Sequence, residues 1–102
     1  MDMDFSNLFS VAGKTVVVTG GSRGIGEMIA AGFLANGAKV IISSRKAQAC
    51  EETVERLKAK YGGEIYAIPS DVGSLDGINH LASELAEREE KIDVLVNNVG
   101  IA

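Results

Sequence analysis

The sequence carries a glycine-rich turn at residues 19–26, with the order Thr-Gly-Gly-Ser-Arg-Gly-Ile-Gly. This turn follows the apolar run Val16–Val18 and comes directly before a helical pattern. The first N–H groups of a helix have no partner within the helix, and the helix dipole favours a negative charge beside them. We therefore predict a phosphate or pyrophosphate site formed by Gly20, Ser22, Arg23, Gly24, Ile25 and Gly26.

The spacing of the glycines distinguishes this turn from two related motifs. It is G-x-x-x-G-x-G, whereas the commoner dinucleotide fingerprint is G-x-G-x-x-G. The triplet Gly13-Lys14-Thr15 is similar to the end of a P-loop, but the earlier glycine of that motif would fall at Leu8 and the triplet precedes the apolar run. A glycine-rich turn without any ligand is the alternative interpretation.

A second polar segment, Ser43-Ser44-Arg45, follows the apolar run at 39–43. NAD sites usually place an acidic residue at this point to bind the ribose 2′-hydroxyl, and none is present here. Arg45 and Arg23 can instead hold a 2′-phosphate by charge-assisted hydrogen bonds, and Ser44 adds a hydroxyl donor. The segment favours NADP(H) over NAD(H), unless both arginines are only solvated surface charges.

The elements that must position these residues follow from four apolar runs that alternate with three helical patterns. The strands are expected at 15–18, 39–43, 64–68 and 92–96, and the helices at 24–36, at 47–60 and after an N-cap at Ser74. This alternation is typical of the α/β class and predicts a Rossmann-type doubly wound parallel sheet with the strand order 3-2-1-4. The winding then reverses between the first and fourth strands, where the glycine-rich turn would face the segment Asn97-Asn98-Val99-Gly100.

The helical patterns also predict which side chains face inward. The expected inward residues are Ile25, Ile29 and Phe33 in the first helix, Ala47, Cys50, Val54 and Leu57 in the second, and Ile78, Leu81, Ala82 and Leu85 in the third. On the outer face of the second helix, Glu52 and Arg56 are spaced to pair with each other. The charged segment 87–91 is expected to be a solvated helix end.

The composition limits the class of protein. The 102 residues are 46% hydrophobic and 24% charged, which predicts one globular domain over residues 1–102. A net charge of −4 argues against nucleic acid as a partner, and no apolar run is long enough to span a membrane. The acidic N-terminus is unlike a secretory signal, so a cytoplasmic location is expected. Cys50 is expected to be a packed core thiol, and His80 a surface residue without a catalytic or metal-binding role.

Three segments together resemble the short-chain dehydrogenase/reductase family, in the right order and over nearly the whole chain. They are the turn at 19–26, Asp71-Val72 after the third strand, and the segment 97–100, which is similar to the N-N-A-G turn of the family. Within the family, the chain is most similar to bacterial 3-oxoacyl carrier-protein reductases. The resemblance implies that Asp71 and Val72 contact the adenine ring, that Asn97 and Gly100 line the cofactor, and that the parent reaction is hydride transfer between NADP(H) and a carbonyl or secondary alcohol.

The chain departs from the family pattern in two respects. Val99 stands where the family usually has alanine. The catalytic asparagine and serine and the Y-x-x-x-K motif of the family all lie beyond the N-N-A-G turn, and neither Tyr61 nor Tyr66 has a lysine four residues later. The resemblance therefore implies an incomplete domain that ends after the fourth strand, contains no catalytic residue and is inactive by itself.

Other functions remain open at this stage. A non-catalytic nucleotide-binding or self-assembling Rossmann fragment would carry the same turn. A methyltransferase would require an acid at the end of the second strand, where Ser44 stands, and is disfavoured. The outer edge of the fourth strand, at 93–96, would offer unpaired backbone groups, so the chain is expected to form a homo-oligomer or to pair with a complementing chain.

Overall fold

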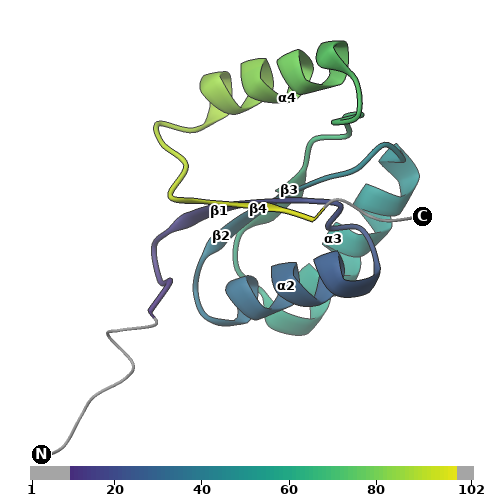
Figure 1. The fold of residues 1–102 in the computed structure, drawn as a ribbon. Helices are drawn as coiled ribbons and strands as arrows, with labels where there is room; N and C mark the ends of the chain where they lie inside the picture. Colours follow the sequence, from purple (N-terminus) through teal and green to yellow (C-terminus); the bar gives the residue numbers. More distant parts are fainter. Residues whose placement is uncertain (1–9, 99–102) are drawn as a thin grey trace, which may run out of the picture.

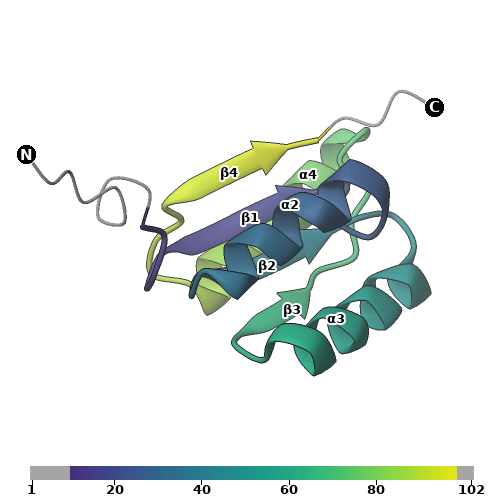
Figure 2. The same cartoon turned by 90° about the horizontal axis from the view of Figure 1, so that it is seen from below.

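The structure, a computed structural model, describes residues 10–98. The elements are β1 (Thr15–Thr19), α2 (Gly24–Ala35), β2 (Lys39–Ser43), α3 (Ala47–Tyr61), β3 (Ile65–Ala67), α4 (Leu75–Arg88) and β4 (Val94–Asn97). All strand pairings are parallel and the order is β3-β2-β1-β4, which confirms the predicted topology. Helices α2 and α3 cover one face of the sheet and α4 lies over the other (Figures 1 and 2).

The two central strands are buried on both faces. Val16, Val17 and Val18 of β1 are fully buried, as are residues 40–42 of β2. Continuous apolar runs of this kind are typical of parallel strands that have helices on both sides. Because β1 and β2 are parallel and their last residues, Thr19 and Ser43, are paired, the turns that follow them lie side by side at the carboxyl edge of the sheet.

Two hydrophobic clusters join the helices to the sheet. The larger one, beneath α2 and α3, includes Val16, Val18, Ala30, Leu34, Val40, Ile42 and Leu57. The smaller one, beneath α4, contains Val17, Ile41, Ile68 and Leu81. Alternate residues of each strand contribute to opposite clusters, as the two-residue period of a strand requires. Helix α4 is therefore held by fewer apolar side chains than α2 and α3.

The inward face of α2 differs from the prediction. Ile25 is 69% exposed and Ile29 and Phe33 are only half-buried, whereas Gly26, Ala30 and Leu34 are buried. The helix is apolar on nearly all sides, so a four-residue period fits more than one face. The small residues define the contact face because they let the helix lie close to the strands.

The other two helices also differ in detail. In α3, Thr53 is buried and Ala47 is exposed, while Cys50 and Leu57 are buried as expected. In α4, Leu81 is the buried residue, whereas Ile78 and Ala82 are exposed. The Ser74 hydroxyl accepts a hydrogen bond from the Gly77 N–H at 3.0 Å, which confirms the predicted N-cap. His80 is exposed, as expected.

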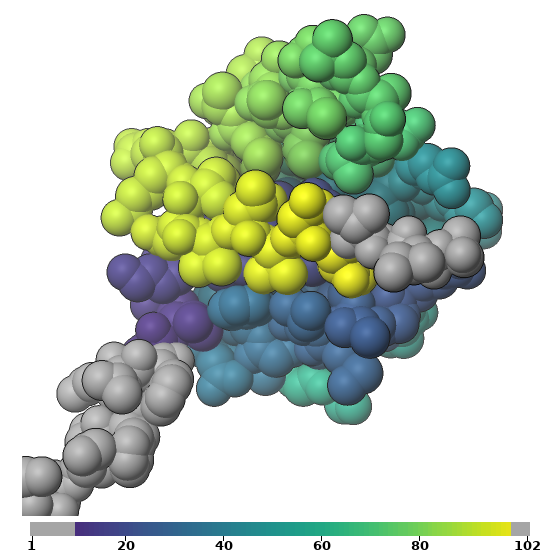
Figure 3. All heavy atoms as spheres, viewed as in Figure 1, coloured from purple at the N-terminus to yellow at the C-terminus, as the bar shows by residue number. Residues whose placement is uncertain are grey.

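The strand and helix ends shift by one or two residues from those expected, most of all in β3 and β4. At the start of β4, Asp93 exchanges two hydrogen bonds with Thr15: its carboxylate accepts the Thr15 N–H at 2.8 Å and its own N–H donates to the Thr15 carbonyl. The pKa of the Asp93 carboxyl is lowered, and the hydrogen bond from the Thr15 N–H is the largest cause. The outer edge of β4 has no paired strand among residues 10–98, and the end of the described chain, in yellow, lies at the surface of the molecule (Figure 3). Leu95 in this strand is 64% exposed.

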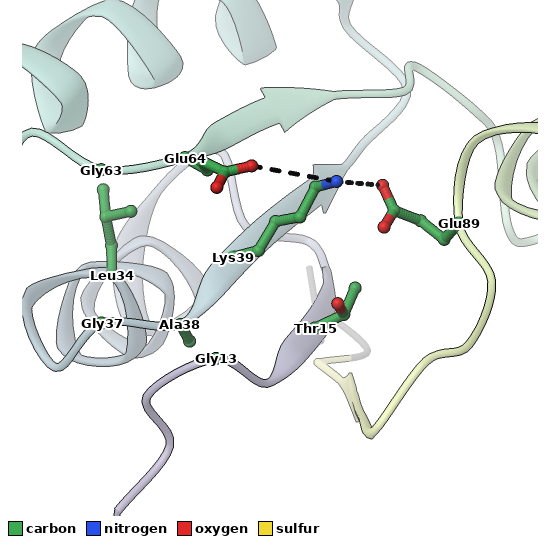
Figure 4. A pocket seen from close by; sticks show the side chains of 9 residues that line it. All are labelled: Gly13, Thr15, Leu34, Gly37, Ala38, Lys39, Gly63, Glu64 and Glu89. Carbon is green, nitrogen blue, oxygen red and sulfur yellow. Dashed lines mark ion pairs between the residues drawn. The ribbon is translucent and has the colours of Figure 1, made fainter.

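The charged segment 87–91 is not simply a solvated helix end, which corrects the prediction. The Glu89 side chain is only 7% exposed and pairs with the Lys39 ammonium at 2.8 Å. The Tyr66 hydroxyl donates a second hydrogen bond to the same carboxylate, also at 2.8 Å. Figure 4 shows Lys39 between Glu64 and Glu89. These contacts fasten the carboxyl end of α4 to β2 and β3.

Candidate cofactor-binding site

The glycine-rich turn leaves the carboxyl end of β1 and enters α2 at Gly24. Its first residue is anchored to the neighbouring strand, because the Gly20 N–H donates to the Ser43 carbonyl at 2.7 Å. Arg23 occupies the N-cap position in an extended conformation, and its side chain makes no capping hydrogen bond. The first backbone N–H groups of α2 thus keep their capacity to bind an anion.

The three predicted glycines have different neighbours. A side chain at Gly20 would bring its Cβ to 2.6 Å from the Asn98 carbonyl oxygen, and one at Gly26 would run into the Gly20 carbonyl. Gly24 has a φ of +62° and no atom within 4 Å of its virtual Cβ. Gly20 and Gly26 are therefore required for packing, whereas Gly24 keeps open the space in front of the helix. A side chain at this position would fill that space, which the close approach of a phosphate to a helix N-terminus requires to be open.

A fourth glycine, Gly21, was not among the predicted site residues and packs the turn against β2. A Cβ at Gly21 would lie 2.8 Å from the Ile42 side chain. The turn therefore rests directly on β2. The motif allows any residue at position 21, so the glycine there was the one feature of the sequence that indicated this close contact with Ile42.

The two predicted cations lie on adjacent turns. Arg23 follows β1 and Arg45 follows β2; both side chains are exposed, and neither forms an ion pair within residues 10–98. Ser44 directly follows β2, and its hydroxyl lies 3.1 Å from the Cys50 sulfur. No carboxylate follows β2 directly, because residues 43–46 are Ser, Ser, Arg and Lys. This corner of the site is suited to a dianionic phosphate.

The loop after β3 holds Asp71 and Val72. The Asp71 carboxylate accepts the Gly73 N–H at 2.9 Å, and its backbone carbonyl accepts hydrogen bonds from the N–H and the hydroxyl of Ser74. Asp71 is exposed, and Val72 is half-buried against the cluster beneath α4. One carboxylate oxygen therefore shapes the loop itself, and the other is available to a ligand.

The segment after β4 faces the glycine-rich turn, as the strand order predicts. The Thr19 hydroxyl donates to the Asn97 side-chain oxygen at 2.8 Å, and Asn98 lies against Gly20 and Gly26. The predicted site residues included Asn97 but not Thr19 or Asn98, although the segment 97–100 was expected to face this turn. Val99 and Gly100 lie outside the described residues.

Helix α3 supports the site through contacts that the sequence analysis did not predict. The Thr53 hydroxyl donates to the Ser22 carbonyl at 2.7 Å. Arg56 pairs with Glu27 of α2 at 2.7 Å and also donates to the Thr53 hydroxyl, so the expected Glu52–Arg56 pair is wrong. The hydrogen bond to Glu27, above other effects, raises the pKa of Arg56. An i,i+4 spacing predicts a pair only when no better partner lies across the helix interface.

The remaining surface offers less to a ligand. A pocket of about 320 Å³ lies at the opposite, amino edge of the sheet, where its one lysine, Lys39, is already paired with Glu89 (Figure 4). Within residues 10–98 no three His, Cys, Asp or Glu side chains are grouped to hold a metal ion. No helix in that range has the length and apolar composition that a bilayer span needs.

Comparison with known proteins gives consistent matches to one family. Residues 14–102 match the family model described as short chain dehydrogenase. The chain is 51% identical over 92 residues to a rhamnolipids biosynthesis 3-oxoacyl-[acyl-carrier-protein] reductase of Pseudomonas aeruginosa, covering 90% of this chain and 35% of that protein. This relative agrees with the expected similarity to 3-oxoacyl carrier-protein reductases.

Solved structures give the same result. An NADP active-site complex of RhlG from Pseudomonas aeruginosa superposes with a TM-score of 0.86 at 51% identity, covering 92% of this chain and 37% of that one. L-sorbose reductase from Gluconobacter frateurii, complexed with NADPH and L-sorbose, gives a TM-score of 0.84 at 33% identity, covering 89% of this chain and 35% of that one. The chain spans about a third of the length of these relatives.

Proposed function

The chain belongs to the short-chain dehydrogenase family, and from that premise we propose that it is the NADP(H)-binding part of an oxidoreductase. The observation that carries the proposal is the corner formed by the turns after β1 and β2. An open helix N-terminus at Gly24 lies there beside two arginines that form no ion pair within residues 10–98, and no acid directly follows β2. The NADP and NADPH complexes of the related reductases support this choice of cofactor.

Each residue has a distinct role in this proposal. The backbone of residues 24–26 binds the pyrophosphate, with Gly20 and Gly26 allowing the close packing behind it. Arg23, Arg45 and the Ser44 hydroxyl bind the 2′-phosphate. Asp71 and Val72 border the adenine ring, and Asn97 and Gly100 border the cofactor beyond β4. The nicotinamide, when bound, supplies the hydride.

The parent reaction in this proposal is hydride transfer between NADP(H) and a carbonyl or secondary alcohol, such as a 3-oxoacyl group. The relative from Pseudomonas aeruginosa, a 3-oxoacyl carrier-protein reductase by name, supports that substrate class. The polypeptide of residues 1–102 has no tyrosine followed by a lysine four positions later. We expect it to bind the cofactor without turnover, so NADPH mixed with a β-keto ester should not be oxidised faster than in a control without protein.

A non-catalytic role is the second proposal, supported by the exposed Leu95 and by the outer edge of β4, which pairs with no strand of residues 10–98. In this case the chain self-associates, or pairs with a complementing chain, and binds the nucleotide without a substrate. Steady oxidation of NADPH by the 102-residue chain would contradict both this role and the expected inactivity.

Calorimetric titration with NADPH and NADH tests the choice of cofactor. We expect NADPH to bind more tightly, and Arg45→Ala to remove most of the difference. The loss of a charge-assisted hydrogen bond costs about 1.5–3 kcal/mol, which is roughly tenfold or more in affinity. Lys46→Ala is the matched control, because Lys46 is the adjacent exposed cation and has no assigned role. Equal affinities of the starting protein for the two cofactors would refute the assignment.

A further inference from the structure

Helix α3 contacts both turns that carry the site's arginines. Cys50 and Thr53 lie three positions apart, on one face of the helix, and are 0% and 1% exposed. Cys50 touches the turn after β2, and Thr53 touches the turn after β1. These are the turns of Arg45 and Arg23, which are themselves solvent-exposed.

The Thr53 contact reaches the centre of the glycine-rich turn. Its hydroxyl donates to the Ser22 carbonyl at 2.7 Å, and this carbonyl belongs to the residue directly before Arg23. The same hydroxyl accepts a hydrogen bond from Arg56 at 3.2 Å, and Arg56 holds Glu27 of α2. The buried hydroxyl thus uses both its donor and its acceptor capacity between α3 and the turn.

The Cys50 contact holds the other turn. Its sulfur lies 3.1 Å from the Ser44 hydroxyl and 3.9 Å from the Ser44 carbonyl. Ser44 directly precedes Arg45, and α3 begins two residues after Arg45. The Ser44 carbonyl also accepts the Ser70 N–H at 2.9 Å. The loop after β3 and the sulfur of α3 therefore together hold the Ser44 backbone.

Within residues 10–98, the hydrogen bond from the Gly20 N–H to the Ser43 carbonyl joins the two turns at their base, and Gly21 lies against Ile42 of β2. Beyond that point, the residues on either side of the site are Ser22 and Ser44, and α3 is bonded to both. We propose that Cys50 and Thr53 are positioning residues that set the separation of Arg23 and Arg45, and thereby determine the preference for a 2′-phosphorylated nucleotide. This inference rests on the proposed function.

The physical reason is preorganisation. Two arginines on independent turns would lose conformational freedom when a phosphate brings them together, and this loss weakens binding. Turns that are held to one helix before binding avoid part of that cost. Ligands without the 2′-phosphate do not use both arginines, so their affinity should depend less on the two α3 contacts.

The test uses the 102-residue chain with two probes that differ only in the phosphate, 2′,5′-ADP and 5′-AMP. Thr53→Val keeps the shape of the side chain but removes the hydroxyl. It should lower the affinity ratio of the two probes about fivefold, the equivalent of one hydrogen bond of roughly 1 kcal/mol. Thr53→Ser, which keeps the hydroxyl, should restore the ratio. Cys50→Ala should lower it in the same direction.

Leu57→Val is the matched control, since Leu57 is buried on the same helix and packs in the cluster beneath α2 and α3. It should reduce stability without changing the ratio of affinities. An unchanged ratio in Thr53→Val, or an equal fall in Leu57→Val, would overturn the inference. The proposed function fails separately, if the starting protein does not distinguish the two probes.

Hydrogen exchange in the nucleotide-free chain tests whether the hydrogen bond from Thr53 to Ser22 restrains the glycine-rich turn. The amides to follow are those of Gly20 and Glu27, which flank the turn and are hydrogen-bonded to the Ser43 and Arg23 carbonyls. In Thr53→Val both should exchange faster than in the starting protein, and in Thr53→Ser at nearly the original rate. Unchanged exchange at these two amides in Thr53→Val would show that α3 does not hold the turn, whatever the nucleotide titrations give.

Discussion

Gly24 and Gly26 lie in the same turn and serve different purposes. Gly24 faces open space with a φ of +62°, and Gly26 packs against the Gly20 carbonyl. Replacing Gly24 by alanine should cost about 1–2 kcal/mol of stability, because only the left-handed backbone is strained. Binding of either NADPH or NADH should fall much further, since the new side chain enters the phosphate space. Thermal unfolding and nucleotide titration of the same sample measure the two effects.

Gly26→Ala provides the contrasting case. Its new Cβ meets backbone atoms that cannot move aside, so the variant should lose more stability than Gly24→Ala and should unfold at a lower temperature. If the two variants lost stability equally while only one lost binding, the packing role assigned to Gly26 would be wrong.

Part of this site could be predicted from residue types alone. Local features of the sequence are the glycines at 20, 24 and 26 and the absence of an acid directly after β2. The structure has the turn between β1 and α2, as these glycines predicted. The bond from Thr53 to Ser22 joins positions 31 residues apart and leaves no local signal. That the segment after β4 faces this turn followed from the strand order, although Thr19 and Asn98 were not assigned to the site.

Among the elements, the end of α4 carries the clearest pH dependence. Burial opposes the ionisation of Glu89, but hydrogen bonds from Lys39 and Tyr66 outweigh it and lower the pKa of that carboxyl. A depressed pKa means that the folded state binds fewer protons, so the stabilisation is present above the ordinary pKa and is lost as the pH falls through the shifted one. Asp93 acts in the same direction. The free energy of unfolding should therefore decrease below about pH 4.5.

Glu89→Gln tests this dependence. It removes the ion pair with Lys39, so the free energy of unfolding at pH 7 should fall by about 1–2 kcal/mol, and its further decline between pH 5 and pH 3 should be shallower. Urea unfolding at a series of pH values measures both effects. Glu87→Gln is the control, an exposed carboxylate in the same helix that should change stability by less than about 0.5 kcal/mol. If the free energy of unfolding declined equally steeply between pH 5 and pH 3 in Glu89→Gln and in the starting protein, Glu89 would not be a source of the acid sensitivity.

The same cluster responds to high pH. Burial, followed by the hydrogen bond to Glu89, raises the pKa of Tyr66 well above its usual value, and the Glu89 hydrogen bond raises that of Lys39. Groups with raised pKa values hold their protons in the folded state, so their stabilisation is complete below the ordinary pKa and is lost as the pH rises beyond about 10. The Glu89→Gln variant should show a weaker alkaline decline as well.

The order and type of the elements could be predicted. Strands buried on both faces are continuous apolar runs in the sequence, and the ends of α2 and α3 are indicated by glycines. The face that each helix turns inward could not be predicted as well. In α2, apolar residues surround the helix, and the small residues Gly26 and Ala30 decide the contact. At the end of α4, a run of five charged residues predicts solvent exposure, and only the tertiary structure brings Lys39 and Tyr66 to Glu89.

At the scale of the whole molecule, the outer edge of β4 is the feature that predicts assembly. In the described part of the chain this edge pairs with no strand and lies beside the exposed Leu95, and few apolar residues of α4 cover that face of the sheet. We expect the 102-residue chain to self-associate at micromolar concentration, because such an edge pairs readily with another strand. Leu95→Lys should shift the equilibrium toward the monomer, as measured by sedimentation velocity.

Met28→Lys is the control for that experiment. Met28 is comparably exposed, at 73%, but belongs to α2 and not to β4. It should leave the association unchanged. A sharp monomer of 10.7 kDa for the starting chain, with cooperative unfolding, would show that this edge does not drive assembly.

The double pairing of β1 also implies an order of folding. Thr15 pairs with Lys39 on one side and with Asp93 on the other, and the second partner lies 78 residues along the chain. Closing that longer loop costs about 1 kcal/mol more in chain entropy than closing the first, so β1 and β2 should join before β4 arrives. In pulse-labelled refolding, amides of residues 40–42 should become protected earlier than those of residues 94–97. The strand that borders the site would then be the last to arrive, and a nascent chain would expose the edge of β1 until it does.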